Sequence, residues 1–369
     1  MNDDFMGCVT DYVDAVSGVP LLDGKEGFLA YWNHAAASGL TQVGISKEYG
    51  GMGGGGPELA EMLRHVTRGT RNLGLSVSLM ISQIVAHYMI GAHGTPEQQK
   101  RWLPDMAKGL YPAAFAVSEA GVGAHPSKLS TTGEPVDGAW SLNGEKSYIS
   151  NGPMAGLVLG VAITGKETDG KNRFSTFLIP GEAKGVDHSD VMDLPFFKPA
   201  QHGSVKLAGV TLDQGALLGP EGDAYRSHVI PFRRYEDAML MACALGAFES
   251  IVDGFSGFAE DDELADGLGT LAGRVAALNV MMRRCAELSE LSGEDVEEEA
   301  SALNFHFKEI VAQSITLMKG LLGDERHLPE RESTLLFELE TSQSLGANVS
   351  AIKKRRRGQK MLKGAKAKG

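Results

Sequence analysis

The side chains best suited to chemistry lie in two strand-like stretches within residues 115–152. The first stretch runs into a turn that carries Gly121 and Gly123, where backbone N–H groups can approach a ligand closely. The second carries Tyr148 and Ser150, an aromatic ring close to a hydroxyl group, which suits a flat heteroaromatic ring with polar edges. Turn glycines and strand aromatics are also common in β cores that bind nothing, so both interpretations stay open on these residues alone.

Two adjacent carboxyl groups are a second candidate for chemistry. Glu236 and Asp237 precede the apolar run Ala238–Leu245, a pattern that is typical of a buried helix. Burial disfavours the charged form of a carboxyl group, so its pKa rises and it becomes a better base near neutral pH. Acidic residues in a first helical turn also interact favourably with the helix dipole, so position alone does not assign them a catalytic role.

Motifs for other chemistries are missing from the sequence. It contains no HExxH, CxxC, G-x-S-x-G or P-loop lysine motif, and its ten histidines lack metal-ligand spacing, so we expect no metal site. Gly50–Gly56 is rich in glycine, but it follows no strand and Pro57 comes next. We therefore interpret it as a flexible loop rather than as a dinucleotide-binding turn.

The composition argues against several classes of protein. A net charge of −12 disfavours a nucleic-acid-binding protein, whose working face must neutralise phosphates. Cys8, Cys243 and Cys285 are widely spaced and odd in number, as expected for reduced thiols rather than a disulfide framework. Residues 1–4 are acidic, unlike the basic start of a signal peptide, and no uninterrupted apolar run reaches transmembrane length. We expect a cytoplasmic protein with no membrane insertion.

The apolar pattern changes twice along the chain. Helical spacing gives way to short β-rich runs separated by turn residues, and helical spacing then returns. We expect an N-terminal helical domain over residues 1–112, a central β domain over 113–221 and a C-terminal helical bundle over 222–350. A basic tail follows over 351–369, with a composition typical of a disordered, solvated end.

Local signals place some of these elements more closely. Leu59–Val66 has an apolar face at helical spacing, and Ser76–Ile90 is apolar nearly all round, as in a buried helix. Thr95 is the expected N-cap of the next helix. Two acidic clusters, Glu260–Glu263 and Glu294–Glu299, are expected to be solvated connections between helices.

Five segments together resemble the acyl-CoA dehydrogenase family. Ser118–His125 and Leu142–Asn151 resemble its signature, commonly T-E-P-G-A-G-S-D followed by L-N-G-x-K-x-W-I-T-N. Lys47–Gly53, Gly94–Lys100 and Leu217–Gly219 resemble further family segments in the family's order. The resemblance covers roughly residues 25–255 and implies an α+β multidomain fold: a helical N-terminal domain, a central β-barrel-like or sandwich domain and a C-terminal four-helix bundle.

The resemblance also implies a cofactor and a set of residues that bind it. The family binds FAD between these domains, at a dimer interface. Ala124 and Asp237 are expected at the substrate. Two departures matter, because Ala124-His125 replaces the usual Ser-Asp and Tyr148 replaces a tryptophan, which leaves a smaller aromatic surface. Ser150 is expected to donate to flavin N5, and the whole set of residues expected at the flavin is Phe115, Val117, Ser118, Gly123, Ala124, Tyr148 and Ser150.

The expected reaction is the α,β-dehydrogenation of an acyl-CoA, with the α-proton passing to a carboxylate and the β-hydride to flavin N5. Glu236 lies ten residues before Gly246, the position of the base in isovaleryl-CoA dehydrogenase, and is the expected catalytic base. Asp237, which replaces the family's usual arginine, is the nearest competitor, followed by Glu338 and Glu340. The family implies an oxidoreductase of fatty acid metabolism that passes electrons to an electron-transfer flavoprotein.

The resemblance becomes weaker after Gly246. The family's arginine segment for the FAD pyrophosphate is replaced by the acidic Phe258–Glu263, and Lys319–Gly323 is a poor version of its glycine loop. Two alternatives therefore stay open beside a homodimeric or homotetrameric FAD enzyme. One is a non-catalytic or half-site subunit of a heteromeric dehydrogenase with a related chain, and the other is a flavin-dependent, oxygen-using offshoot of the family.

Overall fold

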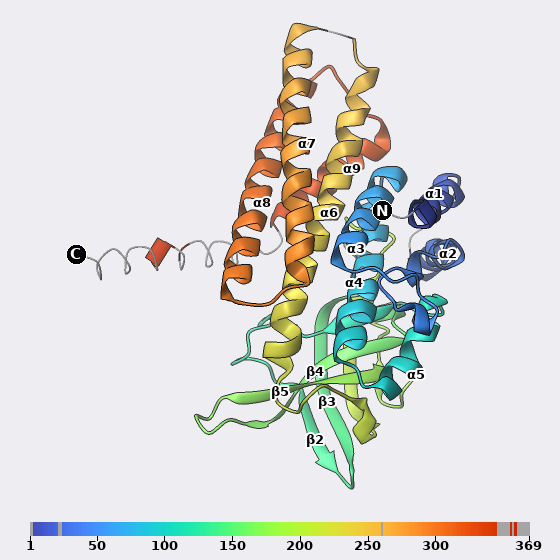
Figure 1. Ribbon diagram of the computed structural model, residues 1–369, viewed down its shortest axis with the longest axis vertical. Helices are drawn as coiled ribbons and strands as arrows, with labels where there is room; N and C mark the ends of the chain where they lie inside the picture. The colour runs from blue at the N-terminus through green and yellow to red at the C-terminus, as the bar shows by residue number, and fades with distance from the viewer. Residues whose placement is uncertain (1–2, 21–23, 260, 345–354, 356–357, 360–369) are drawn as a thin grey trace, which may run out of the picture.

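The computed structural model describes residues 3–20, 24–259, 261–344, 355 and 358–359. Nearly all of the basic tail, whose disorder the composition predicts, lies outside these residues. The described chain is helical in its N-terminal part, forms a mixed β-sheet in its middle and is helical again at its C-terminal end (Figure 1). This organisation confirms the expected fold class.

The N-terminal part is built from helices that pack around a shared core. Leu59, Met62, Leu63 and Val66 form one buried face, as their spacing predicts. Thr95 caps the last helix of this part, where its hydroxyl oxygen accepts from the Gln98 N–H at 3.3 Å. The helices are α1 (Asp3–Ser17), α2 (Gly24–Ala37), α3 (Gly56–Thr70), α4 (Leu73–Ile84), which continues as a π-helix over Val85–Ala92, and α5 (Pro96–Ala107).

The middle of the chain forms an eight-stranded mixed sheet in the order β6-β7-β3-β2-β4-β5-β8, with β1 pairing to β4. β1 runs parallel to β4, whereas β3 and β7 form a long antiparallel pair. The strands are β1 (Ala113–Ala116), β2 (Thr132–Val136), β3 (Ala139–Ser150), β4 (Leu157–Lys166), β5 (Asn172–Pro180), β6 (Val186–Asp187), β7 (His202–Leu212) and β8 (Leu217–Leu218).

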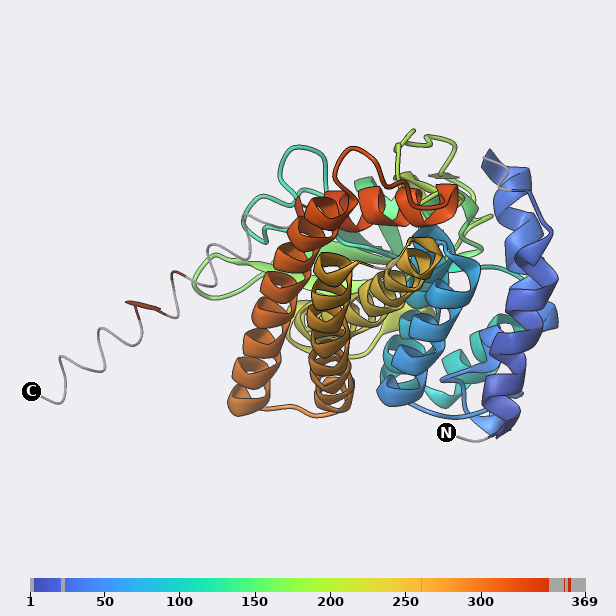
Figure 2. The same ribbon diagram turned by 90° about the horizontal axis from the view of Figure 1, so that it is seen from above.

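Four helices make up the C-terminal region: α6 (Ile230–Gly254), α7 (Asp262–Ser289), α8 (Glu294–Leu322) and α9 (Glu330–Ser344). α9 packs against α6, and in the view from above it is the red helix that follows α8 (Figure 2). The described residues of the two acidic clusters lie at helix starts rather than in connections between helices, contrary to expectation. Asp261 caps α7 by accepting from the Leu264 N–H at 2.8 Å, and Glu294 begins α8, because carboxylates at a helix N-terminus satisfy free N–H groups and the helix dipole.

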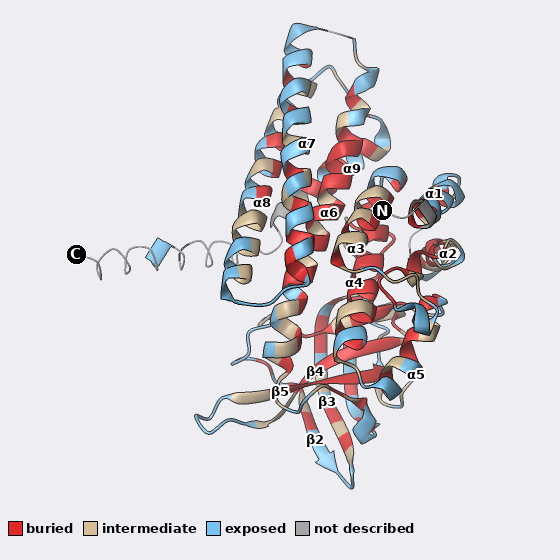
Figure 3. Ribbon diagram, viewed as in Figure 1, coloured by how far each residue is buried: buried red, intermediate tan, exposed pale blue. Residues whose placement is uncertain are grey.

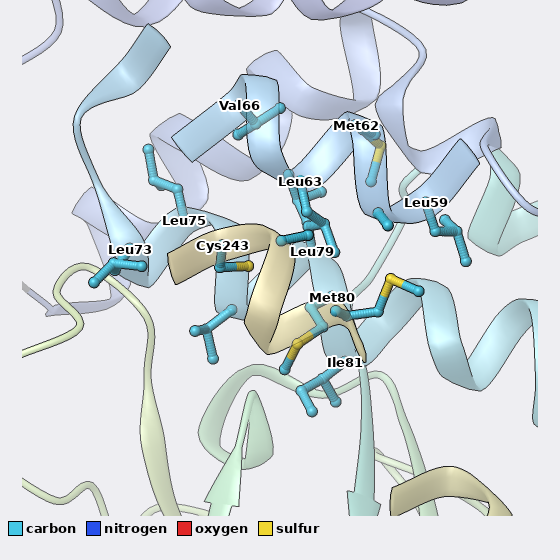
Figure 4. Packing of buried hydrophobic residues seen from close by; sticks show 14 of the residues in the cluster. Leu59, Met62, Leu63, Val66, Leu73, Leu75, Leu79, Met80, Ile81 and Cys243 are labelled. Carbon is cyan, nitrogen blue, oxygen red and sulfur yellow. The ribbon is translucent and has the colours of Figure 1, made fainter. Parts of the chain in front are cut away.

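Close contact between α3, α4 and α6 fixes α6 in the centre of the molecule. Side chains from α3 and α4 surround Cys243 of α6 (Figure 4). A side chain at Gly246 would overlap the carbonyl oxygen of Arg64 on α3, so only glycine allows the two helices to come this close. Dense packing of this kind holds a helix rigidly, so side chains on α6 are well fixed in place.

Two long helical segments meet the length and mean hydropathy of a membrane span, although polar residues interrupt both of them. They are Leu73–Ala92 and Tyr225–Gly257, and 89% and 72% of their most apolar windows are buried inside the protein. Both segments contribute to the core that is red in Figure 3. Their hydrophobicity is explained by this burial.

Candidate active site

A cavity of about 530 Å³ lies between the sheet, α6 and α8, a volume that is common for ligand-binding sites. It brings together side chains from segments far apart in the sequence. Every predicted flavin or substrate residue except Gly123 lines it, as does the predicted base: Phe115, Val117, Ser118, Ala124, Tyr148, Ser150, Glu236 and Asp237.

Tyr148 presents an exposed aromatic ring to this cavity. The residue is 61% exposed and has φ 62°, a left-handed conformation that is uncommon outside glycine. The β3–β7 register shifts between Lys146 and Ile149, and such an irregularity turns a side chain away from its regular direction in the sheet. An exposed ring held by a costly backbone conformation is a surface to which a flat ligand can bind.

Ser150 lies at the end of β3, opposite His202 at the start of β7. The Ser150 Oγ and His202 Nδ1 atoms are 3.1 Å apart. Burial lowers the pKa of His202 to about 4, so its imidazole is neutral at physiological pH. The next residue, Asn151, donates its amide to the carbonyl oxygens of Ser78 at 2.9 Å and Ala113 at 3.0 Å, which fixes this end of β3.

The glycine turn differs in detail from the prediction. Gly123 has φ 61°, but its N–H donates to the Glu119 carbonyl at 3.0 Å and is therefore not available to a ligand. Gly123 is also not among the described residues that line the cavity. Its neighbour Ala124 does line the cavity, and its carbonyl oxygen accepts from the Tyr225 hydroxyl at 2.8 Å. The turn shapes the wall of the cavity and does not supply free donors through Gly123.

A buried ion pair holds the two signature segments together. Lys146 Nζ lies 2.9 Å from Glu119 Oε1 and also donates to the Val117 carbonyl at 3.1 Å. Burial alone would raise the pKa of Glu119, but hydrogen bonds from Thr131, Lys146 and Ser130 lower it to about 2. The pair lies behind the cavity wall, so its contribution is to position Val117 and the strand that carries Tyr148.

Glu236 and Asp237 share a single arginine. Arg233 lies one helical turn before them, with its guanidinium 3.1 Å from a carboxylate oxygen of each. Burial raises the pKa of Glu236, Arg233 lowers it and Asp237 raises it, with a net upward shift. Since α6 begins at Ile230, Glu236 lies in its second turn rather than its first, so the helix dipole does not account for it. The i, i+3 and i, i+4 spacing could have identified Arg233 from the sequence.

A second cavity of about 450 Å³ adjoins the first at Tyr148, Ser150, Glu236 and Asp237. Its other walls are mostly apolar, and residues on α4, α6, α8, α9 and the loop before β7 supply them. No local sequence pattern predicts this cavity, because its walls come from five separate segments. The apolar lining consists of Leu73, Val77, Met80, Ile81, Met192, Leu194, Phe196, Phe197, Leu240, Met241, Cys243, Ala244, Phe307 and Leu339.

The two remaining candidate bases have other roles. Glu338 accepts from the Phe197 N–H at 2.6 Å, and it does not line either cavity among the residues that the structure describes. Glu340 pairs with Lys319 at 2.6 Å on the surface. Of the four candidate bases, Glu236 and Asp237 are therefore the two that line the cavities among the described residues.

Comparison with known proteins extends this description. The acyl-CoA dehydrogenase N-terminal domain matches residues 21–110, and the acyl-CoA dehydrogenase middle domain matches residues 114–208. Acyl-CoA dehydrogenase FadE12 of Mycobacterium bovis is 32% identical over 215 residues, which are 58% of this chain and 54% of that protein. The L-prolyl-(peptidyl-carrier protein) dehydrogenase of Serratia sp. is 27% identical over 191 residues, 52% of this chain and 49% of that protein. The chain spans about half the length of the curated relatives it matches.

Solved structures show the same fold over nearly the whole chain. Butyryl-CoA dehydrogenase of Megasphaera elsdenii superposes with a TM-score of 0.78 at 15% identity, covering 95% of this chain and 98% of that one. A structure of PigA with FAD and proline superposes with a TM-score of 0.79 at 19% identity, covering 97% and 99%. The helices after β8, where sequence similarity is weak, therefore keep the arrangement of these proteins.

Proposed function

Because this chain belongs to the acyl-CoA dehydrogenase family, we propose that it is an FAD-dependent dehydrogenase of acyl-CoA thioesters. The observation that carries the proposal is the meeting of Tyr148, Ser150 and Glu236 at one junction between a mixed cavity and an apolar one. Bound FAD would supply the acceptor for the hydride that leaves the β-carbon of the acyl group. The side chains of this chain bind, orient and deprotonate the substrate.

The residues at the first cavity fit a flavin ring. Tyr148 offers an aromatic face, Phe115 packs against Phe232 with ring centroids 4.5 Å apart, and Ser150 offers a hydroxyl group. Phe258–Glu263 stands where the family has the arginine that binds the FAD pyrophosphate. Its described residues include no positively charged side chain. Asp261 in this segment caps α7 and pairs with Arg326. We infer that other residues or a second chain bind the nucleotide half of FAD.

Glu236 is the proposed acceptor of the α-proton. Its raised pKa gives the carboxylate a higher proton affinity than an exposed glutamate, which suits abstraction of a weakly acidic proton. Arg233 offsets part of this upward shift and fixes the direction of the carboxylate along α6. The adjoining apolar cavity excludes water from the acyl chain, so the α-carbon is presented to Glu236 in a dry environment.

The test is the colour and reduction of the purified protein. We expect it to bind FAD non-covalently and to be yellow, and its flavin absorbance to bleach anaerobically on mixing with at least one member of a panel of acyl-CoAs. A colourless protein that gains no flavin spectrum with excess FAD would contradict catalysis by this chain alone. Reoxidation by an electron-transfer flavoprotein supports that partner, whereas fast reoxidation by oxygen alone supports the oxygen-using alternative.

A second candidate substrate is an acyl group carried on a peptidyl carrier protein. The 27% identity over 191 residues to the L-prolyl-(peptidyl-carrier protein) dehydrogenase of Serratia sp. favours it, because the name of that protein gives a carrier-bound prolyl group as its substrate. Both candidates use the same thioester chemistry and differ in the carrier. Bleaching by prolyl-carrier protein but by no acyl-CoA would identify the carrier-bound thioester as the substrate.

A further inference from the structure

The imidazole of His202 contacts the predicted flavin-facing hydroxyl but has no assigned part in the reaction. Its Nδ1 lies 3.1 Å from Ser150 Oγ, and the two residues are paired across β3 and β7. His202 is 8% exposed, and its carbonyl accepts from the Met192 N–H at 2.8 Å. Both the backbone and the ring of His202 are therefore held in place beside Ser150.

The second ring nitrogen indicates where the single proton of this neutral imidazole lies. His202 Nε2 is buried and has no hydrogen-bond partner among the described residues. A proton on Nε2 would leave a buried donor unpaired and would make Nδ1 an acceptor of the Ser150 proton. A proton on Nδ1 leaves only an acceptor unpaired, and buried acceptors without partners are more common than buried donors without partners. The Nδ1-protonated tautomer is therefore favoured.

The tautomer decides where the hydroxyl proton of Ser150 points. If Nδ1 donates to Ser150 Oγ, the hydroxyl oxygen is already an acceptor, and its own proton is free to point into the cavity. If Nδ1 accepts, the same proton is used inside the protein and Ser150 cannot donate to a ligand. We propose that His202 is a positioning residue that donates to Ser150 Oγ and thereby directs the Ser150 hydroxyl proton toward flavin N5.

This inference rests on the proposed function, because the acceptor is the flavin. Its physical benefit is preorganisation, since a hydroxyl group that is already aligned needs no reorientation when the ligand binds. His202 also lines the second cavity, so it connects the flavin-facing hydroxyl with the apolar wall. Its lowered pKa keeps the ring neutral, so it adds no charge beside the flavin.

The first measurement does not require FAD. The ¹⁵N chemical shifts of the His202 ring in the ligand-free protein report which nitrogen carries the proton. We expect Nδ1 to be protonated and Nε2 to be bare between pH 6 and 8. A proton on Nε2 overturns the proposal whether or not the protein binds flavin, so its failure is distinguishable from failure of the proposed function.

The second measurement compares three variants loaded with FAD. His202→Asn keeps an amide donor near the Nδ1 position, His202→Leu removes it and Ser150→Ala removes the hydroxyl. We expect His202→Leu to shift the flavin spectrum and midpoint potential in the same direction as Ser150→Ala and to slow bleaching about tenfold, the loss expected for one hydrogen bond. His202→Asn should remain near wild type, and adding His202→Leu to Ser150→Ala should change nothing further. An unchanged spectrum and potential in His202→Leu, with a clear shift in Ser150→Ala, contradicts the proposal.

Discussion

At the scale of single residues, the cavity keeps two groups in states that folding alone does not favour. Tyr148 has a left-handed backbone and an exposed ring, and Glu236 is a carboxyl group with a raised pKa. Each state costs stability. Such costs concentrate at functional sites, because chemistry there uses the strained or buried group. The coincidence of both at one cavity supports the proposed function more than either residue does alone.

Glu236→Gln tests the base directly. The amide keeps the shape of the side chain and removes the basic oxygen, so FAD and acyl-CoA should bind as in wild type while flavin bleaching slows by roughly 10² to 10⁴-fold. Asp237→Asn is the matched control, because it lies on the same helix and contacts the same Arg233. It should slow bleaching much less. The opposite ranking of the two variants would assign the base to Asp237.

The same substitution has a pH signature. Only the ionised carboxylate accepts a proton, so the wild-type bleaching rate should rise with pH through the raised pKa of Glu236, whereas the Gln variant should show no such rise. The contribution of Glu236 to the free energy of unfolding should change in the opposite direction and fall as pH rises. A carboxyl group with a raised folded pKa favours the fold at low pH and loses that contribution as pH rises through the folded value. Above the folded pKa of Glu236, the Glu236→Gln variant should therefore unfold at a higher temperature than wild type, and an equal or lower melting temperature would contradict the raised pKa.

At the scale of elements, the sequence predicts local structure well and the site only in part. The strand-like pattern along Ala139–Ser150 coincides with β3. The sequence also shows that Tyr148 and Ser150 lie close together on this strand. Helix α1 lies within the predicted helical domain but is not predicted as a separate helix, although Phe5, Val9 and Tyr12 are buried at helical spacing. The second cavity could not be predicted, because its walls meet only after α4, α9 and the loop before β7 have packed together.

Glu338 forms the contact that joins these elements. It is 4% exposed, and its carboxylate accepts from the Phe197 N–H, a residue with φ 61° that lines the second cavity. Burial raises the pKa of Glu338 to about 7, although the N–H groups of Phe197 and Leu73 lower it. The contact thus links α9 to the start of α4 and to the loop that closes the acyl cavity.

Replacing Glu338 should remove a pH dependence from stability. The folded pKa lies above the ordinary value of 4.5, so the contribution is fully present below pH 4.5 and is lost as pH rises through about 7. A shift of this size corresponds to roughly 3 kcal/mol. The melting temperature of wild type should therefore fall more steeply between pH 5 and pH 8 than the melting temperature of Glu338→Gln. The Gln variant keeps an acceptor oxygen but has no titrating carboxyl group. If the melting temperatures of the two proteins changed in parallel with pH, the pKa of Glu338 would not be shifted.

At the scale of the whole molecule, one helix face has no partner among the residues that the structure describes. The outer side of α7 is exposed along several turns and carries small or apolar residues: Gly269, Ala272, Gly273, Ala276 and Val280. Val280 is 69% exposed, and this side of α7 is pale blue in Figure 3. A net charge of −12 disfavours self-association, so an uncharged stripe is a more favourable place for two copies to meet than a charged surface. We infer that the homodimer proposed for this chain uses α7.

Light scattering of the FAD-loaded protein tests the assembly. We expect a particle of at least twice 39.2 kDa, and we expect Val280→Glu to dissociate it, because two glutamates brought together by a two-fold axis repel one another. Leu110→Glu is the matched control, since Leu110 is 63% exposed but lies outside α7, and it should leave the assembly intact.

If a second chain binds the nucleotide half of FAD, Val280→Glu should also lose flavin, whereas Leu110→Glu should stay yellow. A stable monomer of 39.2 kDa with bound FAD would refute the dimer, and a colourless protein that co-purifies with a related chain would support the heteromeric alternative.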